Sequence, residues 1–443
     1  MPTGSKRKRD EFDFGAGADG AQAPGAAGAG GPAAGHGGPV QEGRGESSWR
    51  RGMRRMDESD AFELNTEALQ GLQHAETLLY HERKQLRTKV VALAVALVVV
   101  LCLSLCIVVS GFGYISPLEV LQCVQLFFQI QFEKLFTTNV PLNTTEVMAL
   151  QPNYYEVTSR FSISVLTAAC GALLALSGCL YQNVFRNPIA APTMLGVTSG
   201  VNIGLVILVI VMGSGALYAT GMRYALCYAG SLIVLAIVFL GGRAIGGRGN
   251  FNVVNMMLIG SVVSQLVGTV VTFITNLFMD DDMYEIYFEL QEQLDVDASI
   301  ISWVALGIVC VVSITPIVMM RFSLNALSFT EEDSKLLGVN PNVLRMVSLL
   351  CGSIMVIAAM IYCGNVSMVS LLVPHIARLL FGSEFRKQLL GNVLIGSVLL
   401  LVCRDLCDLI PFLDTGLPIG TMVTFVTLPF FVWMLAVQQR SWE

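Results

Sequence analysis

The sequence predicts an all-α, polytopic membrane protein with about ten transmembrane helices. Of its 443 residues 54% are hydrophobic and only 14% are charged, and the mean hydropathy is +0.64, which excludes an ordinary soluble globule. The first long apolar run, from Val90 to Ser110, contains no charged residue and is long enough to cross ~30 Å of hydrocarbon at ~1.5 Å per residue. The protein is expected to contact the lipid bilayer and no nucleic acid, because its basic run Lys6 to Arg9 is short.

The chain is predicted to have three regions, of which the last is the membrane domain. Residues 1–55 are rich in Gly, Ala and Pro, with too little apolar surface to offset the entropy of ordering, and are predicted to be a disordered cytoplasmic tail. Residues 56–89 place leucines among Glu, Gln and Arg and predict a cytoplasmic amphipathic helix. Residues 90–443 form the membrane domain. Nine further spans are predicted after the first, at about 161–182, 193–212, 223–241, 252–278, 299–320, 343–362, 366–381, 390–408 and 418–437.

The positions of Lys and Arg predict the orientation. An even number of spans puts both termini on one side, and with the N-terminus inside, the inner loops after the second span are far richer in these residues. The outer loops hold only Lys134, Arg160 and Arg223, whereas the inner side holds Arg186, Arg243, Arg248, Arg321, Lys335, Arg345, Arg378, Arg386, Lys387 and Arg440. The rule that positive residues stay inside therefore predicts a cell-membrane protein with cytoplasmic termini.

Neither cysteines nor glycines indicate a cofactor site. Nearly all of the 11 cysteines lie in apolar runs, where they act as small hydrophobes, so no metal site is predicted. The glycine-rich stretch 241–249 lacks the Gly-Lys-Ser/Thr ending that binds ATP phosphates. Any energy from ATP must therefore come from another subunit.

The segment from Ser367 to Glu384 is the first candidate for a functional membrane motif. Pro374 removes a backbone donor inside a span, and His375 and Arg378 follow it. Polar groups at this depth are costly unless they meet protein or a water-filled path. Asp405, next to Arg404 in the outer part of the ninth span, is a second such group, for which a structural ion pair and a substrate contact are both possible.

The inner loop 324–345 predicts two short helices that meet at a glycine. The run from Glu331 to Leu337 is helical in character and Gly338 ends it, whereas Asn340 is an N-cap with Pro341 at the first helical position. The loop is therefore expected to form a rigid knuckle on the cytoplasmic face.

Several of these motifs together resemble a known family. The stretches A-L-S-G-C-L-Y-Q (175–182), R-N-P-I-A-A-P (186–192), P-H-I-A-R (374–378) and L-P-I-G (417–420) are similar to signatures of the permeases that import iron chelates, haem and vitamin B12 through ABC transporters. The resemblance covers about residues 90–440. It implies a type II ABC importer permease that carries out no chemistry, binds no cofactor itself and depends on ATP hydrolysed by a partner subunit.

The resemblance also implies partners and site residues. The partners are ABC ATPase subunits, an extracellular substrate-binding protein and a second permease copy or a homologue. The segment E-E-D-S-K-L-L-G-V resembles the part that family members press into their ATPase. The residues implied are Glu331, Glu332, Ser334, Leu337, Gly338 and Val339 for coupling; Gly260, Ser261, Ser264, Gly268 and Thr272 of the fifth span for the substrate path; and Arg186, Asn187, Pro188, Pro374, His375, Arg378 and Asp405 for the membrane motifs.

External docking departs from the family pattern. Of the R-x-P-R run that precedes the second span in the family only Arg160 remains, with Val157 at its start, and Leu409 stands where a late arginine is expected. The outer loop from Asp280 to Asp297 instead carries eight acids and no base. We therefore expect Asp280, Asp281 and Asp282, with Arg160 as a secondary contact, to meet basic residues of a binding protein.

Two other classes of function stay open on the sequence alone. An ion-coupled secondary transporter would use His375, Arg378 and Asp405 as relay residues, and a scaffold or receptor would act through the N-terminal segment. Co-purification of an ATPase distinguishes the importer from the secondary transporter.

Overall fold

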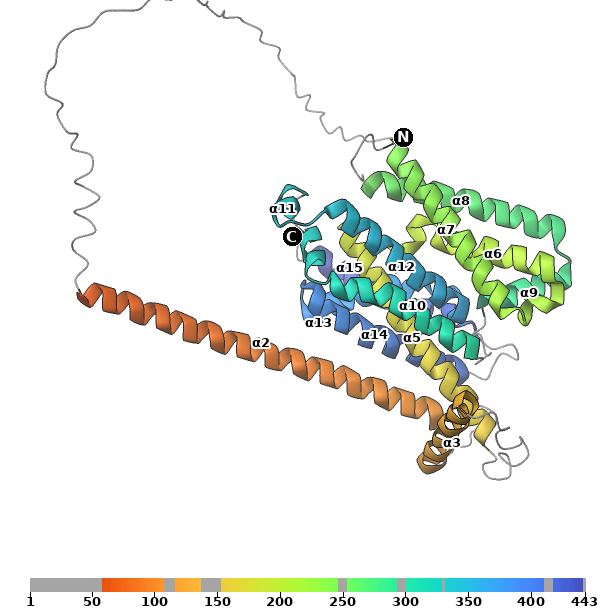
Figure 1. The fold of residues 1–443 in the computed structure, drawn as a ribbon, viewed down its shortest axis with the longest axis horizontal. Coiled ribbons are helices and arrows are strands. Elements are labelled where there is room, and N and C mark those ends of the chain that lie inside the picture. The colour runs from red at the N-terminus through yellow and green to blue at the C-terminus, as the bar shows by residue number, and fades with distance from the viewer. Residues whose placement is uncertain are drawn as a thin grey trace, which may run out of the picture. The chain divides into compact units, whose positions relative to one another are not determined.

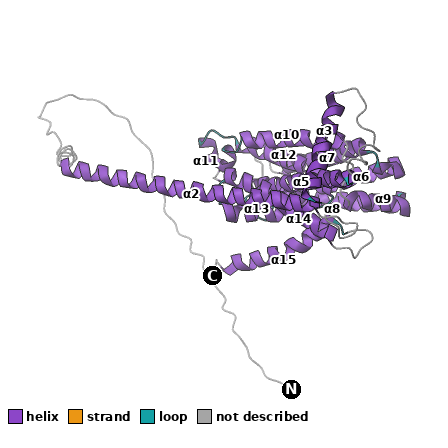
Figure 2. Ribbon diagram, turned by 90° about the horizontal axis from the view of Figure 1, so that it is seen from below, coloured by secondary structure: helices purple, strands orange, loops and turns teal. Residues whose placement is uncertain are grey.

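The computed structural model describes residues 58–106, 116–136, 153–245, 253–292, 300–328, 331–409 and 417–440, and within these ranges the chain forms helices and no strands (Figure 2). The predicted tail, 1–55, lies outside the described residues. The helices, labelled in Figure 1, are α2 (Glu58–Cys106), α3 (Pro117–Phe136), α5 (Tyr154–Phe185), α6 (Val197–Met212), α7 (Thr220–Ile245), α8 (Val253–Phe278), α9 (Asp281–Glu292), α10 (Ile300–Met319), α11 (Glu331–Leu336), α12 (Pro341–Cys363), α13 (Ser367–Phe381), α14 (Phe385–Leu409) and α15 (Ile419–Arg440), with short 3-10 turns η2 (Pro192–Leu195), η3 (Gly213–Leu217) and η4 (Ser323–Ser328).

The chain divides into two compact units, Met1–Glu76 and Thr77–Glu443. The described part of the first unit is the beginning of α2, so the predicted helix within 56–89 is present and extends without interruption to Cys106. The cytoplasmic placement of that helix stays a prediction. All other described elements belong to the second unit.

Within the described residues every predicted span coincides with a helix, and the end of the first span, 107–110, lies outside them. Seven helices of the described chain are long and apolar enough to cross a membrane, namely Tyr80–Leu105, Tyr154–Phe185, Val197–Leu217, Thr220–Ile245, Val254–Phe278, Pro341–Cys363 and Phe385–Leu409. Shorter apolar helices cover Pro117–Ile130, Trp303–Met319, Ser367–Phe381 and Ile419–Trp433. The three remaining predicted spans correspond to the last three of these. A multi-pass, all-α membrane protein is confirmed.

Helix α5 lies at the centre of the core, where it packs against α12, α13 and α14. Its closest approach is to α14, because a Cβ added to Gly171 would lie 2.2 Å from the Gly396 carbonyl oxygen, and one added to Gly396 would lie 2.3 Å from the Gly171 carbonyl oxygen. Two backbones can approach so closely only where both residues lack a side chain. This pair therefore fixes the register of α5 on α14.

The glycines at the start of the third predicted span make a similar contact. A Cβ on Gly200 would lie 2.3 Å from Cα of Ser231, and one on Gly204 would lie 2.6 Å from the Leu226 carbonyl oxygen. Gly196 has a φ of 75° and begins α6. Gly200 and Gly204 therefore let α6 pack tightly on α7.

Helix α3 was not predicted. It packs against the beginning of α5 and, with it, forms a small core in which Cys123 and Val157 are fully buried. A capping box begins the helix: the Ser116 hydroxyl accepts from the backbone N–H of Glu119, and the Glu119 carboxylate accepts from the backbone N–H of Ser116, both at 3.3 Å. That S-P-L-E pattern, with proline at the first helical position, is a sequence signal from which this helix could have been predicted.

Candidate functional site

The motif around Pro374 packs directly against the A-L-S-G motif of α5. Proline has no N–H, so Pro374 leaves the Ser370 carbonyl, one turn earlier in α13, without its helical donor. At this turn Gly178 of α5 meets α13, and a Cβ on Gly178 would lie 1.7 Å from the Ser370 carbonyl oxygen. Two motifs that lie far apart in the sequence therefore form one contact.

A single amide extends this contact to Arg378. Gln182, one turn after Gly178 on α5, donates through Nε2 to the Leu371 carbonyl at 2.9 Å. Its Oε1 accepts a hydrogen bond of 3.0 Å from Arg378 Nη2. The buried amide of Gln182 thus connects backbone and side-chain groups of α13, and Arg378 is held by protein rather than by lipid. His375 lies half-buried on the same helix.

The turn from Arg186 to Pro188 ends α5 and connects it to η4. Arg186 has a φ of 50°, in the left-handed region, and the backbone N–H of Asn187 donates to the Gln182 carbonyl at 3.3 Å. The Asn187 side chain accepts from the backbone N–H of Ile189. Arg186 Nε donates to the Leu327 carbonyl at 2.8 Å. The motif therefore positions the segment that leads into α11.

The knuckle at 324–345 has the predicted geometry. Gly338 has a φ of 76° and its N–H donates to the Lys335 carbonyl at 2.9 Å, so it ends α11. Asn340 Oδ1 accepts from the backbone N–H of Asn342 at 3.1 Å, and Pro341 follows the cap.

The six coupling residues divide into buried and exposed ones. Ser334 is buried, and its hydroxyl donates to the Ala326 carbonyl at 2.7 Å, which ties α11 to η4. Val339 packs partly against the main core. Glu332 is exposed, and Leu337 is 62% exposed beside Leu336, which is 86% exposed. The side chain of Glu331 lies outside the described part of the chain. We call the exposed face of Leu336 and Leu337 the coupling surface.

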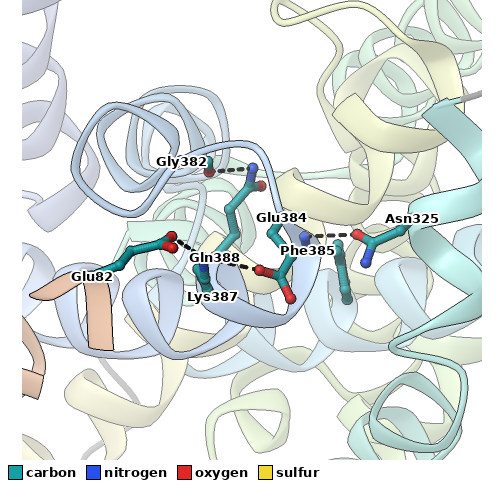
Figure 3. A network of polar contacts seen from close by, with 7 residues as sticks. All are labelled: Glu82, Asn325, Gly382, Glu384, Phe385, Lys387 and Gln388. Carbon is teal, nitrogen blue, oxygen red and sulfur yellow. Dashed lines mark hydrogen bonds and ion pairs between the residues drawn. The ribbon is translucent and has the colours of Figure 1, made fainter. Parts of the chain in front are cut away.

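The turn between α13 and α14 contacts both η4 and α2 (Figure 3). Asn325 Oδ1 accepts from the backbone N–H of Phe385 at 2.9 Å. Two residues later, Lys387 Nζ lies 2.5 Å from Glu82 Oε1 and 3.1 Å from Glu384 Oε2. Lys89 Nζ donates to the Leu380 carbonyl at 2.6 Å, near the end of α13. One turn thus joins the first membrane helix to the base of the knuckle.

The five predicted path residues of α8 do not share one face. Gly260 is buried, and its Cβ would lie 2.2 Å from the Met194 carbonyl oxygen of η2. Ser264 is half-buried, and its backbone carbonyl faces the Ser199 hydroxyl of α6 at 3.4 Å. The remaining three lie along a more open face, since Ser261 and Thr272 are exposed and a Cβ on Gly268 would meet nothing within 4 Å. Gln265 and Asn276 are also exposed on α8.

A cavity of about 650 Å³ lies at the end of the helices away from the knuckle. It is formed where α9 and α12 end and where α13 and α15 begin. Helix α12 starts beside the knuckle and ends at the cavity, and its 23 residues span about 34 Å at ~1.5 Å per residue. The polar and aromatic lining includes Gln291, Asn365, Ser367, Thr421, Thr424 and Phe425.

The predicted outer residues have local partners or lie exposed. Arg160 Nε lies 3.5 Å from Glu156 Oε1, one turn away on α5. Asp280, Asp281 and Asp282 are exposed at the start of α9. Asp405 is half-buried beside Ser104, whereas Arg404 pairs with Asp408 at 3.3 Å.

Comparison with known proteins identifies the family. A model of the FecCD transport family matches residues 96–437. The chain belongs to the FecCD transport family. This membership confirms the resemblance that the motifs indicated.

Relatives of this FecCD chain include three transport permeases. It is 29% identical over 283 residues to the hemin transport system permease protein of Yersinia pestis, covering 62% of this chain and 81% of that protein. It is 28% identical over 276 residues to the Fe(3+) dicitrate transport system permease protein of Escherichia coli K12, covering 62% and 81%. It is 30% identical over 284 residues to the cobalamin import system permease protein of Halobacterium salinarum, covering 63% and 72%.

A solved structure shares the fold of this FecCD chain. It is described as an inward-facing conformation of an ABC transporter of the metal-chelate type, and it aligns with a TM-score of 0.59 at 23% identity, covering 79% of this chain and 99% of that one. Sequence reasoning identified the motifs of this fold but missed the Glu82 and Lys387 contact, because no local pattern pairs residues so far apart.

Proposed function

We propose that this chain is the transmembrane permease subunit of an ABC importer that moves an iron chelate, haem or a cobalamin-like molecule across the cell membrane. Membership of the FecCD transport family carries the proposal, and the relatives' described cargoes, hemin, Fe(3+) dicitrate and cobalamin, define the substrate class. The chain itself catalyses no reaction. ATP is hydrolysed by partner subunits.

The ATPase docks on the coupling surface. Leu336 and Leu337 are apolar and exposed, and apolar side chains rimmed by charge are typical of protein interaction sites. The bond from Ser334 to η4, the turn at Gly338 and the Asn340 cap hold these leucines on a rigid base. Movement of the ATPase can therefore be transmitted to α12, and through η4 and Asn325 to the turn before α14.

A second copy of the chain, or a homologue, covers the open face of α8. Exposed Ser261, Gln265, Thr272 and Asn276 recur on this helix. Ser261, Thr272 and Asn276 donate to carbonyls of α8 itself, but a face with this many polar groups suits a protein or aqueous neighbour better than lipid. Two such faces across a dimer would enclose a path of small and neutral polar groups, in which cargo binds weakly during passage.

The knuckle faces the cytoplasm in this proposal, as do both termini, and the cavity lies toward the outside. An extracellular substrate-binding protein delivers cargo there. Its contact includes the exposed acids Asp280, Asp281 and Asp282, with Arg160 as a secondary contact, and so it would present basic residues.

Reconstitution tests the proposed function. The full chain would be purified with its co-purifying ATPase, placed in lipid vesicles, and assayed for uptake of iron chelates, haem and cobalamin with ATP supplied on the ATPase side. ATP-dependent uptake of at least one of these cargoes is expected. Uptake that follows a proton or sodium gradient without ATP would instead establish the secondary transporter.

A further inference from the structure

The cavity at the outer ends of α9, α12, α13 and α15 is lined by neutral groups. Amides of Gln291 and Asn365 and hydroxyls of Ser367, Thr421 and Thr424 supply its polar atoms, and Phe425 adds an aromatic ring. Among the residues that the structure describes, those that line the cavity carry no charge. Its volume of about 650 Å³ falls in the ~300–1,000 Å³ range of small-molecule sites. The cavity can therefore hold a chelate-sized molecule.

Neutral lining discriminates between cargoes by charge. An anion that enters must give up water, and amides and hydroxyls replace that hydration only in part when no cation is present. A neutral complex with its own amide and carbonyl groups loses little free energy when it gives up its water, since the same lining donates hydrogen bonds to it and accepts them from it. The lining therefore disfavours a cargo with several exposed carboxylates or phenolates.

Acidic residues on α9, the helix that ends at the cavity, act in the same direction. Gln291 lies in the last turn of α9, and the preceding turns of this helix expose Asp281, Asp282 and Glu285. The sequence contains no Lys, Arg or His between Arg248 and Arg321, so this segment supplies no compensating cation. The exposed surface of α9 that leads toward Gln291 therefore carries negative charge, which attracts cations and repels anions.

The hydrogen-bond partner of Gln291 on α9 is also neutral. Tyr287 is buried, and its hydroxyl oxygen accepts a hydrogen bond from Gln291 Nε2. Burial raises the pKa of the Tyr287 phenol to about 12, so the phenol stays neutral at physiological pH. Gln291 is thereby held in a neutral hydrogen-bonded pair.

We infer that this cavity is a cargo subsite selective for neutral or cationic, amide-rich metal chelates, such as ferric trihydroxamates, over anionic chelates. The inference rests on the proposed function and narrows its substrate class. It separates this chain from a permease for a polycarboxylate chelate, because the cavity offers such a cargo no positive side chain and the neighbouring helix repels it.

A charge series tests the selectivity. The full chain in nanodiscs of uncharged phosphatidylcholine would be titrated, by equilibrium dialysis of labelled iron, with a ferric trihydroxamate, a ferric trihydroxamate bearing a free amine and a ferric tricatecholate. These complexes carry no net charge, one positive charge and three negative charges. The first two should bind at least about tenfold more tightly than the third, and this ratio should fall to about threefold or less in 1 M salt, where the Debye length is ~3 Å.

Substitutions identify the residues that cause the selectivity between chelates. Asp281→Asn/Asp282→Asn/Glu285→Gln should reduce the ratio to about threefold or less, and Glu285→Gln alone should reduce it part-way. The matched control is Glu119→Gln, which removes the same charge from an exposed site on α3 that does not line the cavity, and it should leave the ratio unchanged. Thr421→Val keeps the side-chain size and should weaken binding of the neutral chelate about threefold, by loss of one hydrogen bond.

The outcomes separate this inference from the proposed function. Equal binding of all three chelates, tighter binding of the tricatecholate, or binding indifferent to Thr421→Val would overturn the inference even if ATP-driven uptake is observed. Failure of every chelate to bind would overturn it as well, and the ATP-driven uptake assay then decides independently whether the proposed function stands.

Discussion

Lys387 Nζ lies 2.5 Å from the carboxylate of Glu82, a residue 305 positions earlier in the chain (Figure 3). The pair joins α2, in the stretch just before the first predicted span, to the turn that begins α14. The same turn binds Asn325 at the base of the knuckle. The first membrane helix is thus connected by side-chain contacts to the segment proposed to meet the ATPase.

The first prediction concerns this pair. Both side chains are partly exposed, so the ion pair should contribute little to stability and should be screened by salt. Glu82→Gln should lower the thermal midpoint of the purified chain by no more than a few degrees. In a Lys387→Gln background the same substitution should have almost no further effect, as a double-mutant cycle requires for a direct pair. Fully additive losses would show that the two residues act separately.

The second prediction concerns the contact between α5 and α13. Gly178→Ala puts a methyl group 1.7 Å from the Ser370 carbonyl oxygen, so the helices must separate, at a cost of at least about 2 kcal/mol. Gly307→Ala is the matched control, because its methyl group would meet nothing within 4 Å, and it should change stability by about 1 kcal/mol or less. The fraction of chain that stays monodisperse after heating measures the stability of both variants. Similar behaviour of the two variants would contradict the packing described.

The sequence predicted most of the fold because its signals were local. Long apolar runs located the spans, and Gly338, Asn340 and Pro341 located the knuckle by their backbone preferences. It missed α3, whose alternation of glutamines with apolar residues lacks the character of a membrane span. The sequence also could not show that Gly260 is packed against another segment whereas Gly268 is open, both being on α8. The side of a helix that faces a neighbour depends on packing between distant segments.

Val157, at the predicted external docking site, also shows that local sequence does not reveal packing between distant helices. Val157 aligns with an expected docking arginine, yet it is fully buried beneath α3. Its replacement of a charged residue thus has a structural reason: a cation there would be desolvated against Cys123 and Ile130. Nothing in the local sequence around Val157 shows that another helix covers it.

The third prediction separates architecture from proton relay. If His375 serves architecture, His375→Gln should retain most ATP-driven uptake, because glutamine can still hydrogen-bond at membrane depth. Pro374→Leu should impair assembly or gating, since it restores a donor to the Ser370 carbonyl at the turn that Gly178 contacts. Both variants would be assayed in vesicles with and without ATP. Loss of uptake in His375→Gln, together with uptake driven by a proton gradient alone, would favour the secondary transporter.

The fourth prediction concerns the end of α11. Gly338 has a φ of 76°, a conformation that costs about 1–2 kcal/mol for a residue with a side chain. Gly338→Ala should therefore loosen the knuckle and reduce uptake per ATP hydrolysed, while the chain still inserts and folds. Gly307→Ala, where a Cβ would also meet nothing within 4 Å, is the control for a helical glycine elsewhere. Equal coupling in both variants would show that the turn geometry is unimportant.

The central claim is that an ATPase docks on the coupling surface and drives cargo through this chain. The most direct measurement is cargo-stimulated ATP hydrolysis and uptake by the purified complex, compared between the native chain and Leu337→Glu, which puts a charge on a side chain that is 62% exposed. Leu337→Glu should insert normally but abolish stimulated hydrolysis and uptake together. Unchanged stimulation and uptake in Leu337→Glu would contradict it.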